Sequence, residues 1–449
     1  MNQLKIVFQQ WQKWFLFIIA LLLQLLYCVR LWLPSLNKPI WTDEAVGVVS
    51  SAVQTPIHLL FWNGAPGQAS PSPLHFIINN IWFDLWNNTP QVYWDLNFFF
   101  RIFPVFYFAI ACVSLFLYVS YFFRKKFPQY SFYLSVLVGL AASAYYYTND
   151  FGRYYALENR AYSPWLTLST IHLLFFWHSF QETFGKKAWF FYGLVCVLMV
   201  LNTYVALVQV SFALFIQYIS PFLFEKRKKL SEWKKTLTPY LTILSICTFC
   251  AFWYFAKVQQ MGWTIYFPMY WEALGEVITK SFHHHNVAPL IISMPLFCIV
   301  APYVFRKTPG VIPATVLGWA LLLFTLVLFI GCKLKGNLFH SRQFIFLLPT
   351  MTLFYALGLF LLFKIISQFL NRFLKIKKNI QPVYLLCVWA FVEILRIPGF
   401  AQTIHKDWYF WEKFNVYKKT ENPECYKPID GNAEQLIILN DLCRGRKLN

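Results

Sequence analysis

Charged residues are scarce in this sequence, and their scarcity excludes a soluble globular fold for most of the chain. Asp, Glu, Lys and Arg make up 13% of the 449 residues, about half of their usual share in soluble domains. Hydrophobic residues make up 58% and aromatic residues 21%. Lipid is therefore the predicted environment of most of the chain.

Acidic residues are the scarcer of the two charged kinds, with 19 Asp and Glu against 39 Lys and Arg. A net charge of +20 would suit nucleic acid only if the basic residues gathered on a soluble face. Here they stand in short runs between apolar segments. We therefore exclude nucleic acid as a partner and take the basic runs as signals of membrane orientation.

Long apolar segments follow one another along the chain, and each is near the ~20 residues that a bilayer requires. We predict an all-α polytopic membrane protein with about eleven transmembrane helices. No signal-peptide cleavage site follows the first span, so we expect that span to be retained. The predicted spans are residues 14–33, 99–122, 131–148, 161–180, 188–203, 205–224, 237–256, 287–305, 311–331, 343–363 and 381–400.

The basic runs fall in alternate loops, which fixes a predicted orientation. By the positive-inside rule the N-terminus is cytoplasmic, while the loop after the first span and the C-terminal tail are extracytoplasmic. We expect residues 1–400 to form the membrane domain and residues 401–449 a small external tail. In an oxidising compartment, Cys425 and Cys443 of this tail would be able to form a disulfide. The composition favours a bacterial inner membrane.

The first external loop, residues 34–98, is too long for a simple connection and too apolar for a free linker. Its many aromatic residues suit headgroup depth, so we expect amphipathic helices lying in the interface. At the start of this loop, Asp43 and Glu44 stand side by side. Two carboxylates at the mouth of a span suit a polar active site. The alternative is a solvated turn in which Asp43 caps the following helix.

Two further external segments are rich in arginine and lysine, although the positive-inside rule predicts few of them there. The first contains Arg153 and Arg160, and the second contains Lys333, Lys335 and Arg342. Because the guanidinium fork matches phosphate oxygens, both segments could hold a phosphate. The alternative for the first segment is that nearby acidic residues and lipid headgroups neutralise its arginines.

A metal site is not predicted. His283, His284 and His285 are consecutive, and adjacent histidines rarely converge on one ion. No cofactor is required by the sequence, although a divalent cation remains open.

Several motifs in the same order resemble those of the GT-C glycosyltransferases, and within them the protein O-mannosyltransferase and lipid A aminoarabinose transferase group. The resemblance covers roughly residues 10–220 and a patch near 335–360. The chain departs from the group's pattern near Asp150, where the group has Gln-Glu. The matching segments are Asp43-Glu44, Pro71-Ser72-Pro73-Leu74-His75, Arg101-Ile102-Phe103-Pro104, Arg153-Tyr154-Tyr155-Ala156-Leu157, and Arg342-Gln343-Phe344 with Leu348-Pro349.

The resemblance implies a GT-C fold and transfer of a hexosyl or pentosyl group from a polyprenyl-phosphate donor. The acceptor would be a hydroxyl of a lipid, a glycan or a protein at the extracytoplasmic face. Asp43 would be the general base of an inverting reaction. Arg153 and Arg342, with Lys333 or Lys335, would stabilise the leaving phosphate.

The resemblance also implies roles for the neighbouring residues. Glu44 would orient the loop or bind a nearby basic group, since adjacent helical residues point apart. Asp150 would position the acceptor or help to bind a divalent cation. Arg101, His75 and Tyr155 would support the site; alternatively, Arg101 is an arginine whose side chain reaches back to the interface.

Two other classes of membrane protein remain open. A secondary transporter should show internal repeats and broken helices at mid-membrane, and the sequence shows no repeat. A lipid-linked glycan ligase or polymerase would use the same donor but has a large external loop late in the chain, whereas here the longest external loop comes first.

Overall fold

A computed structural model describes most of the helical part of this chain. The described residues are 2–35, 40–41, 55–61, 73–87, 96–126, 132–180, 184–223, 230–260, 271–281, 296–335, 341–374, 381–382, 384–385, 388–389, 392, 416–419 and 426–428.

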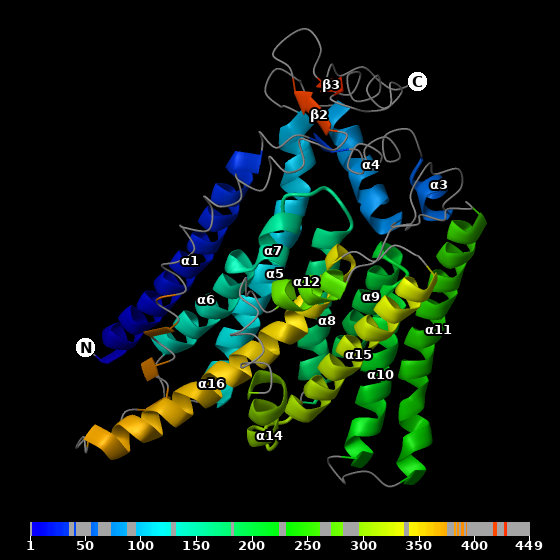
Figure 1. The fold of residues 1–449 in the computed structure, drawn as a ribbon. Coiled ribbons are helices and arrows are strands. Elements are labelled where there is room, and N and C mark those ends of the chain that lie inside the picture. The colour runs from blue at the N-terminus through cyan, green and yellow to red at the C-terminus, as the bar shows by residue number, and fades with distance from the viewer. Residues whose placement is uncertain are drawn as a thin grey trace.

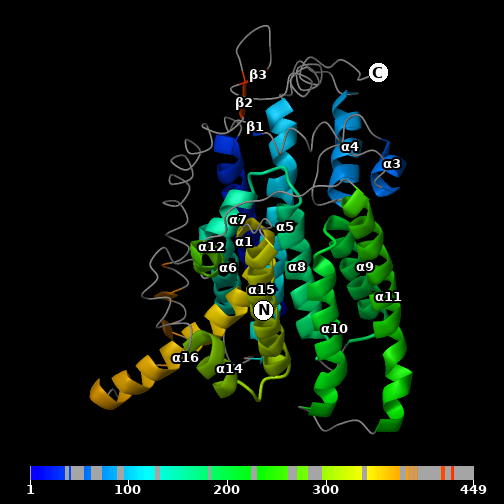
Figure 2. The ribbon, with the colours of Figure 1, turned by 45° about the vertical axis from the view of Figure 1, so that its right-hand side comes forward.

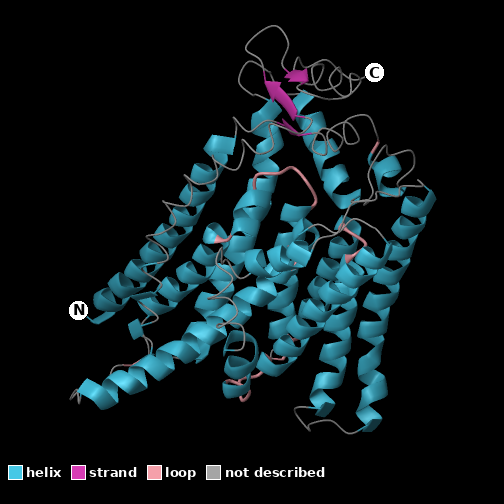
Figure 3. Cartoon of the chain, viewed as in Figure 1, coloured by secondary structure: helices cyan, strands magenta, loops and turns pink. Residues whose placement is uncertain are grey.

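Within these residues, five helices are long and apolar enough to cross a membrane, and each coincides with a predicted span. The chain is therefore an integral membrane protein built mainly of helices (Figures 1 and 3). The five helices are α1 (Asn2–Ser35), α5 (Leu96–Lys126), α11 (Leu230–Gln260), α15 (Val311–Lys335) and α16 (Leu347–Leu374).

Four further helices of 17 or 18 residues pack among them, again at predicted spans. They are α6 (Phe132–Thr148), α8 (Tyr162–His178), α9 (Lys186–Asn202) and α10 (Ala206–Leu223). The predicted span 287–305 contains a π-helical turn, η2 (Leu296–Val300), followed by α14 (Ala301–Val304). The count of eleven spans stays a prediction, because most of residues 381–400 lie outside the described residues.

The outer surface of the bundle carries large apolar side chains, as expected where lipid is the solvent. A soluble protein would bury most of them. Strongly exposed examples come from six different helices: Phe15 at 67%, Phe190 at 70%, Phe215 at 61%, Phe249 at 71%, Leu323 at 62% and Phe373 at 74%.

Glycines allow close contact at two helix pairs, as is common in membrane bundles. A Cβ atom on Gly139 of α6 would overlap the Ser120 hydroxyl and lie 2.8 Å from the backbone oxygen of Phe116, both on α5. A Cβ atom on Gly318 of α15 would lie 2.6 Å from the ring of Phe354 on α16.

Three consecutive tyrosines on α6 join it to three other helices. The ring centroid of Tyr145 lies 4.8 Å from that of Tyr355 on α16. The Tyr146 hydroxyl lies 2.9 Å from the Thr170 hydroxyl on α8. The Tyr147 hydroxyl donates a hydrogen bond of 3.0 Å to a backbone oxygen of α1, that of Gln24. Since successive helical residues point about 100° apart, one short segment can reach three neighbours.

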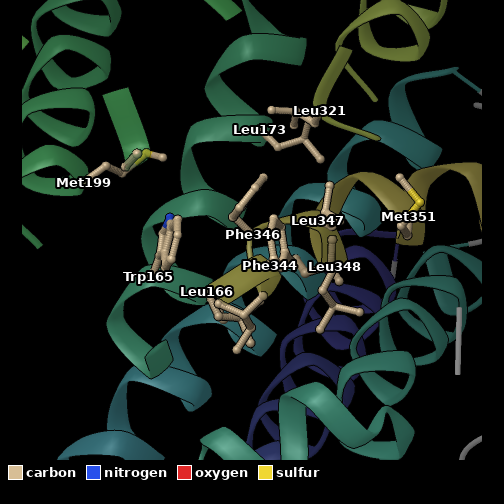
Figure 4. Close-up of a cluster of buried hydrophobic side chains, with 14 of the residues drawn as sticks. Trp165, Leu166, Leu173, Met199, Leu321, Phe344, Phe346, Leu347, Leu348 and Met351 are labelled. Atoms are coloured by element: carbon tan, nitrogen blue, oxygen red, sulfur yellow. The ribbon is translucent and has the colours of Figure 1, made fainter. Parts of the chain in front are cut away.

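The centre of the bundle is an aromatic and aliphatic cluster between α8 and the start of α16 (Figure 4). The rings of Trp165 and Phe346 stack with their centroids 5.1 Å apart. Leu166, Leu348 and Met351 are also buried there. This packing fixes the position of η3 (Ser341–Phe344), the short 3₁₀ helix just before α16.

Three short strands form a small antiparallel sheet in the order β1-β2-β3. They are β1 (Ile40–Trp41), β2 (Val416–Lys419) and β3 (Tyr426–Pro428). Ile40 is paired with Tyr417 and Trp41 with Val416, so the segment that follows α1 is joined to the C-terminal part of the chain. The sheet lies at the same end of the bundle as the short helices α3 (Pro56–Phe61) and α4 (Pro73–Asn87), as Figures 1 and 2 show.

The described cysteines carry no disulfide. Cys28, Cys112, Cys196, Cys247 and Cys298 are buried within the bundle, in accord with their prediction as small apolar residues. Cys387, Cys425 and Cys443 lie outside the described residues.

Candidate active site

Two short helices between α1 and α5 begin with local signals in the sequence. Pro56 and Pro73 each occupy the first position of a helix, where a missing N–H costs nothing. The Thr55 hydroxyl accepts a hydrogen bond of 3.3 Å from the backbone N–H of His58 and so caps α3. Tyr254 of α11 then donates a bond of 3.0 Å to the backbone oxygen of Leu60, which holds α3 against the bundle.

The helix α7 (Asp150–Tyr155) follows α6 after one residue. Asn149 caps it, because its side-chain oxygen accepts a bond of 3.3 Å from the N–H of Gly152. A Cβ atom on Gly152 would lie 2.5 Å from the backbone oxygen of Tyr146, so only glycine fits this tight fold-back. The next residue, Arg153, is 7% exposed. The tight turn therefore leads directly to a buried arginine.

Arg101, near the start of α5, is fully buried and donates a hydrogen bond of 2.6 Å to the backbone oxygen of Leu157. This short charge-assisted bond ties α5 to the turn that follows α7. The guanidinium is thus directed into the protein, and its side chain does not reach back to the lipid interface.

The same turn is held from α4. Nε2 of His75 lies 3.3 Å from the backbone oxygen of Asn159 and 3.1 Å from the side-chain nitrogen of Asn79. The side-chain nitrogen of Asn159 donates a bond of 3.3 Å to the side-chain oxygen of Asn79. On the far side, Asn202 of α9 donates a bond of 2.9 Å to the backbone oxygen of Ala161. Three helices thus hold one turn.

Burial lowers the pKa of His75 to about 3, and the positive charge of Arg160 adds to the effect. The hydrogen bond to Asn159 opposes this shift but does not overcome it. His75 is therefore neutral near pH 7. Its contacts hold the turn, and it carries no charge there.

The turn also buries a carboxylate that the sequence reasoning did not select. Glu158 is 2% exposed, beside Leu157, the residue that accepts the bond from Arg101. A buried carboxylate is costly unless charges or hydrogen bonds compensate it. Asn79 and Asn159 were missed as well. The spacing of His75 and Asn79 by four residues places both on one helix face, and this could have revealed the polar face of α4.

The helix α12 (Trp271–Ser281) links the two predicted phosphate-binding segments, since it contacts both α7 and η3. It comes from the middle of the chain, where the sequence showed no motif. The ammonium group of Lys333 lies 4.6 Å from the centre of the Trp271 ring, which is a cation–π contact. Lys333 at the end of α15 is therefore attached to the helix that bridges α7 and η3.

The structure places the other predicted site residues as follows. Asp150 is the first residue of α7, Lys335 is the last residue of α15, and Arg342 is in η3. Tyr155 is 5% exposed, and its ring centroid lies 5.2 Å from that of Tyr162.

Other predictions fall on parts of the chain that are not described. Asp43 and Glu44 lie outside the described residues, immediately beyond β1, as do His283, His284 and His285. Among the described residues, no group of three or more metal-binding side chains is present.

No family model matches this sequence, and no curated protein matches it. Solved structures do match the fold. ArnT from Cupriavidus metallidurans, bound to undecaprenyl phosphate, has a TM-score of 0.52 and 9% identity, covering 85% of this chain and 75% of ArnT. AglB from Archaeoglobus fulgidus, an archaeal oligosaccharyltransferase in complex with an inhibitory peptide and a dolichol-phosphate, has a TM-score of 0.49 and 11% identity. That match covers 98% of this chain and 64% of AglB.

The described helices and the likeness to ArnT agree with the fold that the sequence motifs predicted. Identity this low establishes architecture and leaves the activity to be argued from the site. The chain shares the fold of the ArnT structure.

Proposed function

We propose that this protein is an inverting glycosyltransferase that moves a sugar from a polyprenyl-phosphate donor to an acceptor hydroxyl at the extracytoplasmic face of the membrane. The GT-C fold supports this proposal, because the similar ArnT structure holds undecaprenyl phosphate. Lipid-phosphate sugars place the reacting group at the interface and the polyprenyl tail among the helices.

One observation carries the proposal. Segments that the sequence singled out one by one meet around the turn at residues 157–161: α4 through His75, α5 through Arg101 and α7 through the peptide chain itself. The helix α12 brings η3, which contains Arg342, against α7. A lipid-exposed bundle without a polar function has no need to bury Arg101, Arg153 and Glu158 together at one end.

In the proposed reaction the acceptor oxygen attacks the anomeric carbon of the sugar. The new bond joins that carbon to the acceptor oxygen, and the bond from carbon to phosphate oxygen breaks with its electron pair remaining on the phosphate. Asp43 takes the proton of the acceptor hydroxyl as general base. The configuration at the anomeric carbon inverts because attack and departure occur on opposite faces.

The leaving polyprenyl phosphate gains negative charge, so positive groups lower the barrier more than an acid would. Arg153 and Arg342 are the proposed ligands of this phosphate, and Lys333 and Lys335 add positive charge nearby. Asp150 is proposed to position the acceptor and Glu44 to orient the loop. The reaction needs no redox cofactor; a divalent cation on Asp150 is one further option.

The proposed membrane arrangement has eleven spans with the N-terminus in the cytoplasm, and a bacterial inner membrane suits it. The helices α6, α8, α9 and α10, with 17 or 18 residues, are at the lower limit of length for a membrane span and are proposed to complete the bundle. The helices α3 and α4 are proposed to lie in the interface, because Ile57, Ile81 and Leu85 are 67%, 51% and 53% exposed. Residues 401–449 form the proposed external tail.

A transfer assay tests the proposal. Purified protein in lipid vesicles is given radiolabelled polyprenyl-phosphate sugars and membrane extract as acceptor. Wild type is compared with Asp43→Asn, and with Asp84→Asn as a control for loss of an exposed carboxylate on α4. We expect Asp43→Asn to lower transfer at least 100-fold, as for other general bases, and Asp84→Asn to transfer normally.

Two results would contradict the proposal. Equal transfer by wild type and Asp43→Asn would remove Asp43 as the base. Folded wild type that transfers no sugar from any polyprenyl-phosphate donor would remove the glycosyltransferase function itself.

A further inference from the structure

The sheet joins two parts of the chain that are far apart in sequence. Trp41 follows the first membrane helix, and its partner Val416 belongs to the C-terminal tail. By sequence alone the tail was a small appendage. In the structure its strand β2 is the central strand, with β1 on one side and β3 on the other.

The strand β1 depends on this pairing. It is two residues long, Ile40–Trp41, and an isolated strand of this length has no stability in water. Its partner β2 is four residues long and is itself supported by β3, through the pairs Tyr417 with Pro428 and Lys419 with Tyr426. The proline fits at the edge of a sheet, where its missing N–H breaks no ladder bond. Three strands from two distant segments therefore stabilise one another.

The strand β1 lies just before Asp43 in the chain, so its pairing affects the proposed catalytic base. Trp41 stands two residues before Asp43, and two residues of chain span at most about 7 Å. Whatever fixes the backbone of Trp41 therefore limits where Asp43 can lie. A displacement of only about 1 Å can lower the rate of an enzymatic step by 100-fold.

We propose that the C-terminal tail positions the proposed catalytic loop, by pairing its strand β2 with β1 immediately before Asp43. The helices α5 and α7 supply the buried Arg101 and Arg153, and the tail holds the segment that leads to the base. The tail is thus part of the site's framework, with Tyr417 as the positioning residue at the centre of the sheet. The catalytic consequence rests on the proposed function, whereas the pairing itself does not.

The pairing can be tested by cross-linking in the full-length protein. Cysteines are introduced as Ile40→Cys with Tyr417→Cys, and as Trp41→Cys with Val416→Cys, and disulfide-linked peptides are identified by mass spectrometry. At least one in-register pair should cross-link, since directly opposite residues lie within disulfide range. The pair Ile40→Cys with Lys419→Cys, two positions out of register, is the matched control. Equal yields for this control, or no product from either in-register pair, would overturn the proposal.

The positioning role is tested with proline substitutions. Tyr417→Pro removes a backbone N–H from the central strand. Thr420→Pro is the control, because position 420 follows the last residue of β2 and the residue before a proline favours the extended conformation of a strand. We expect Tyr417→Pro to lower kcat for transfer at least tenfold with the donor KM within about twofold of wild type. Thr420→Pro should keep both values, and the thermal unfolding of the membrane domain should be unchanged in both variants.

Amide hydrogen exchange separates failure of this proposal from failure of the proposed function. Tyr417→Pro should speed exchange at residues 40–44 at least tenfold, whether or not the protein transfers sugar. Unchanged exchange, or faster exchange with unchanged kcat, would overturn the positioning role and leave the proposed function intact. If wild type transfers no sugar, the proposed function fails and the catalytic role of the tail fails with it, while exchange and cross-linking still decide whether the tail holds the loop.

Discussion

The guanidinium of Arg101 donates a hydrogen bond of 2.6 Å to the backbone oxygen of Leu157, which joins the start of α5 to the turn that follows α7. Arg101 is fully buried, so water cannot replace this bond if the side chain is shortened. The bond connects two of the segments that the sequence motifs selected independently.

Replacing Arg101 with methionine should therefore destabilise the protein. A buried bond to a charged group contributes about 1.5–3 kcal/mol, and the carbonyl oxygen would be left without its donor. The measurement is thermal unfolding in detergent. Arg124→Met removes an exposed arginine from the other end of the same helix and should unfold as wild type does. Equal unfolding temperatures for both variants would show that the bond to Leu157 contributes nothing.

His75 should make stability depend on pH. Its pKa is about 3 in the folded protein against 6.5 for the unperturbed side chain, so below pH 6.5 the unfolded chain binds a proton that the folded chain does not. The contribution of His75 to the free energy of unfolding is therefore fully present above pH 6.5. On acidification it falls by about 1.4 kcal/mol per pH unit, until about pH 3.

Unfolding at pH 7.5 and pH 5 checks this expectation. The loss between the two pH values should be about 2 kcal/mol smaller in His75→Gln than in wild type. His58→Gln changes an exposed histidine on α3 and should keep the wild-type pH dependence. A wild-type pH dependence in His75→Gln would mean that His75 is not the group responsible.

Arg153 should affect transfer through the leaving phosphate. Arg153→Gln removes a charge that acts mainly in the transition state, so kcat should fall about 100-fold. Arg153→Lys keeps the charge but loses the planar fork, and its loss should be smaller. Arg306→Gln, at an exposed position whose guanidinium lies 4.3 Å from the Tyr303 ring centre, is the control and should transfer normally. Normal transfer by Arg153→Gln would exclude Arg153 from the phosphate site.

Gly139 should tolerate no larger residue. The added methyl group of Gly139→Ala would overlap Ser120 and crowd the backbone of α5, and such overpacking costs about 1–3 kcal/mol. Gly331→Ala provides the matched control, because a Cβ atom there meets nothing within 4 Å. Alanine should even favour the helix at that position. The measurement is the thermal unfolding of the two variants. If Gly139→Ala unfolds at the wild-type temperature, α5 and α6 pack less closely than the structure shows.

The motifs could be identified from the sequence because each consists of residues that lie close together in the chain. Pro56 and Pro73 begin helices by their fixed backbone angle, and the apolar segments predict spans by their length. The interactions that assemble the site join residues far apart in the chain. Arg101 and Leu157 are 56 positions apart, and His75 and Asn159 are 84 apart. No periodicity in one segment reveals which distant backbone oxygen its side chain will reach.

The sequence by itself determined the membrane environment and the helical class, because scarce charge and repeated apolar segments leave few other ways to satisfy the backbone in lipid. Its ordered motifs also predicted the GT-C fold that the likeness to ArnT supports. Only the tertiary structure decided that α12 bridges α7 and η3, that Glu158 is buried, and that the tail pairs with β1. These are packing and pairing choices between distant segments, and their energies depend on three-dimensional proximity that local patterns do not encode.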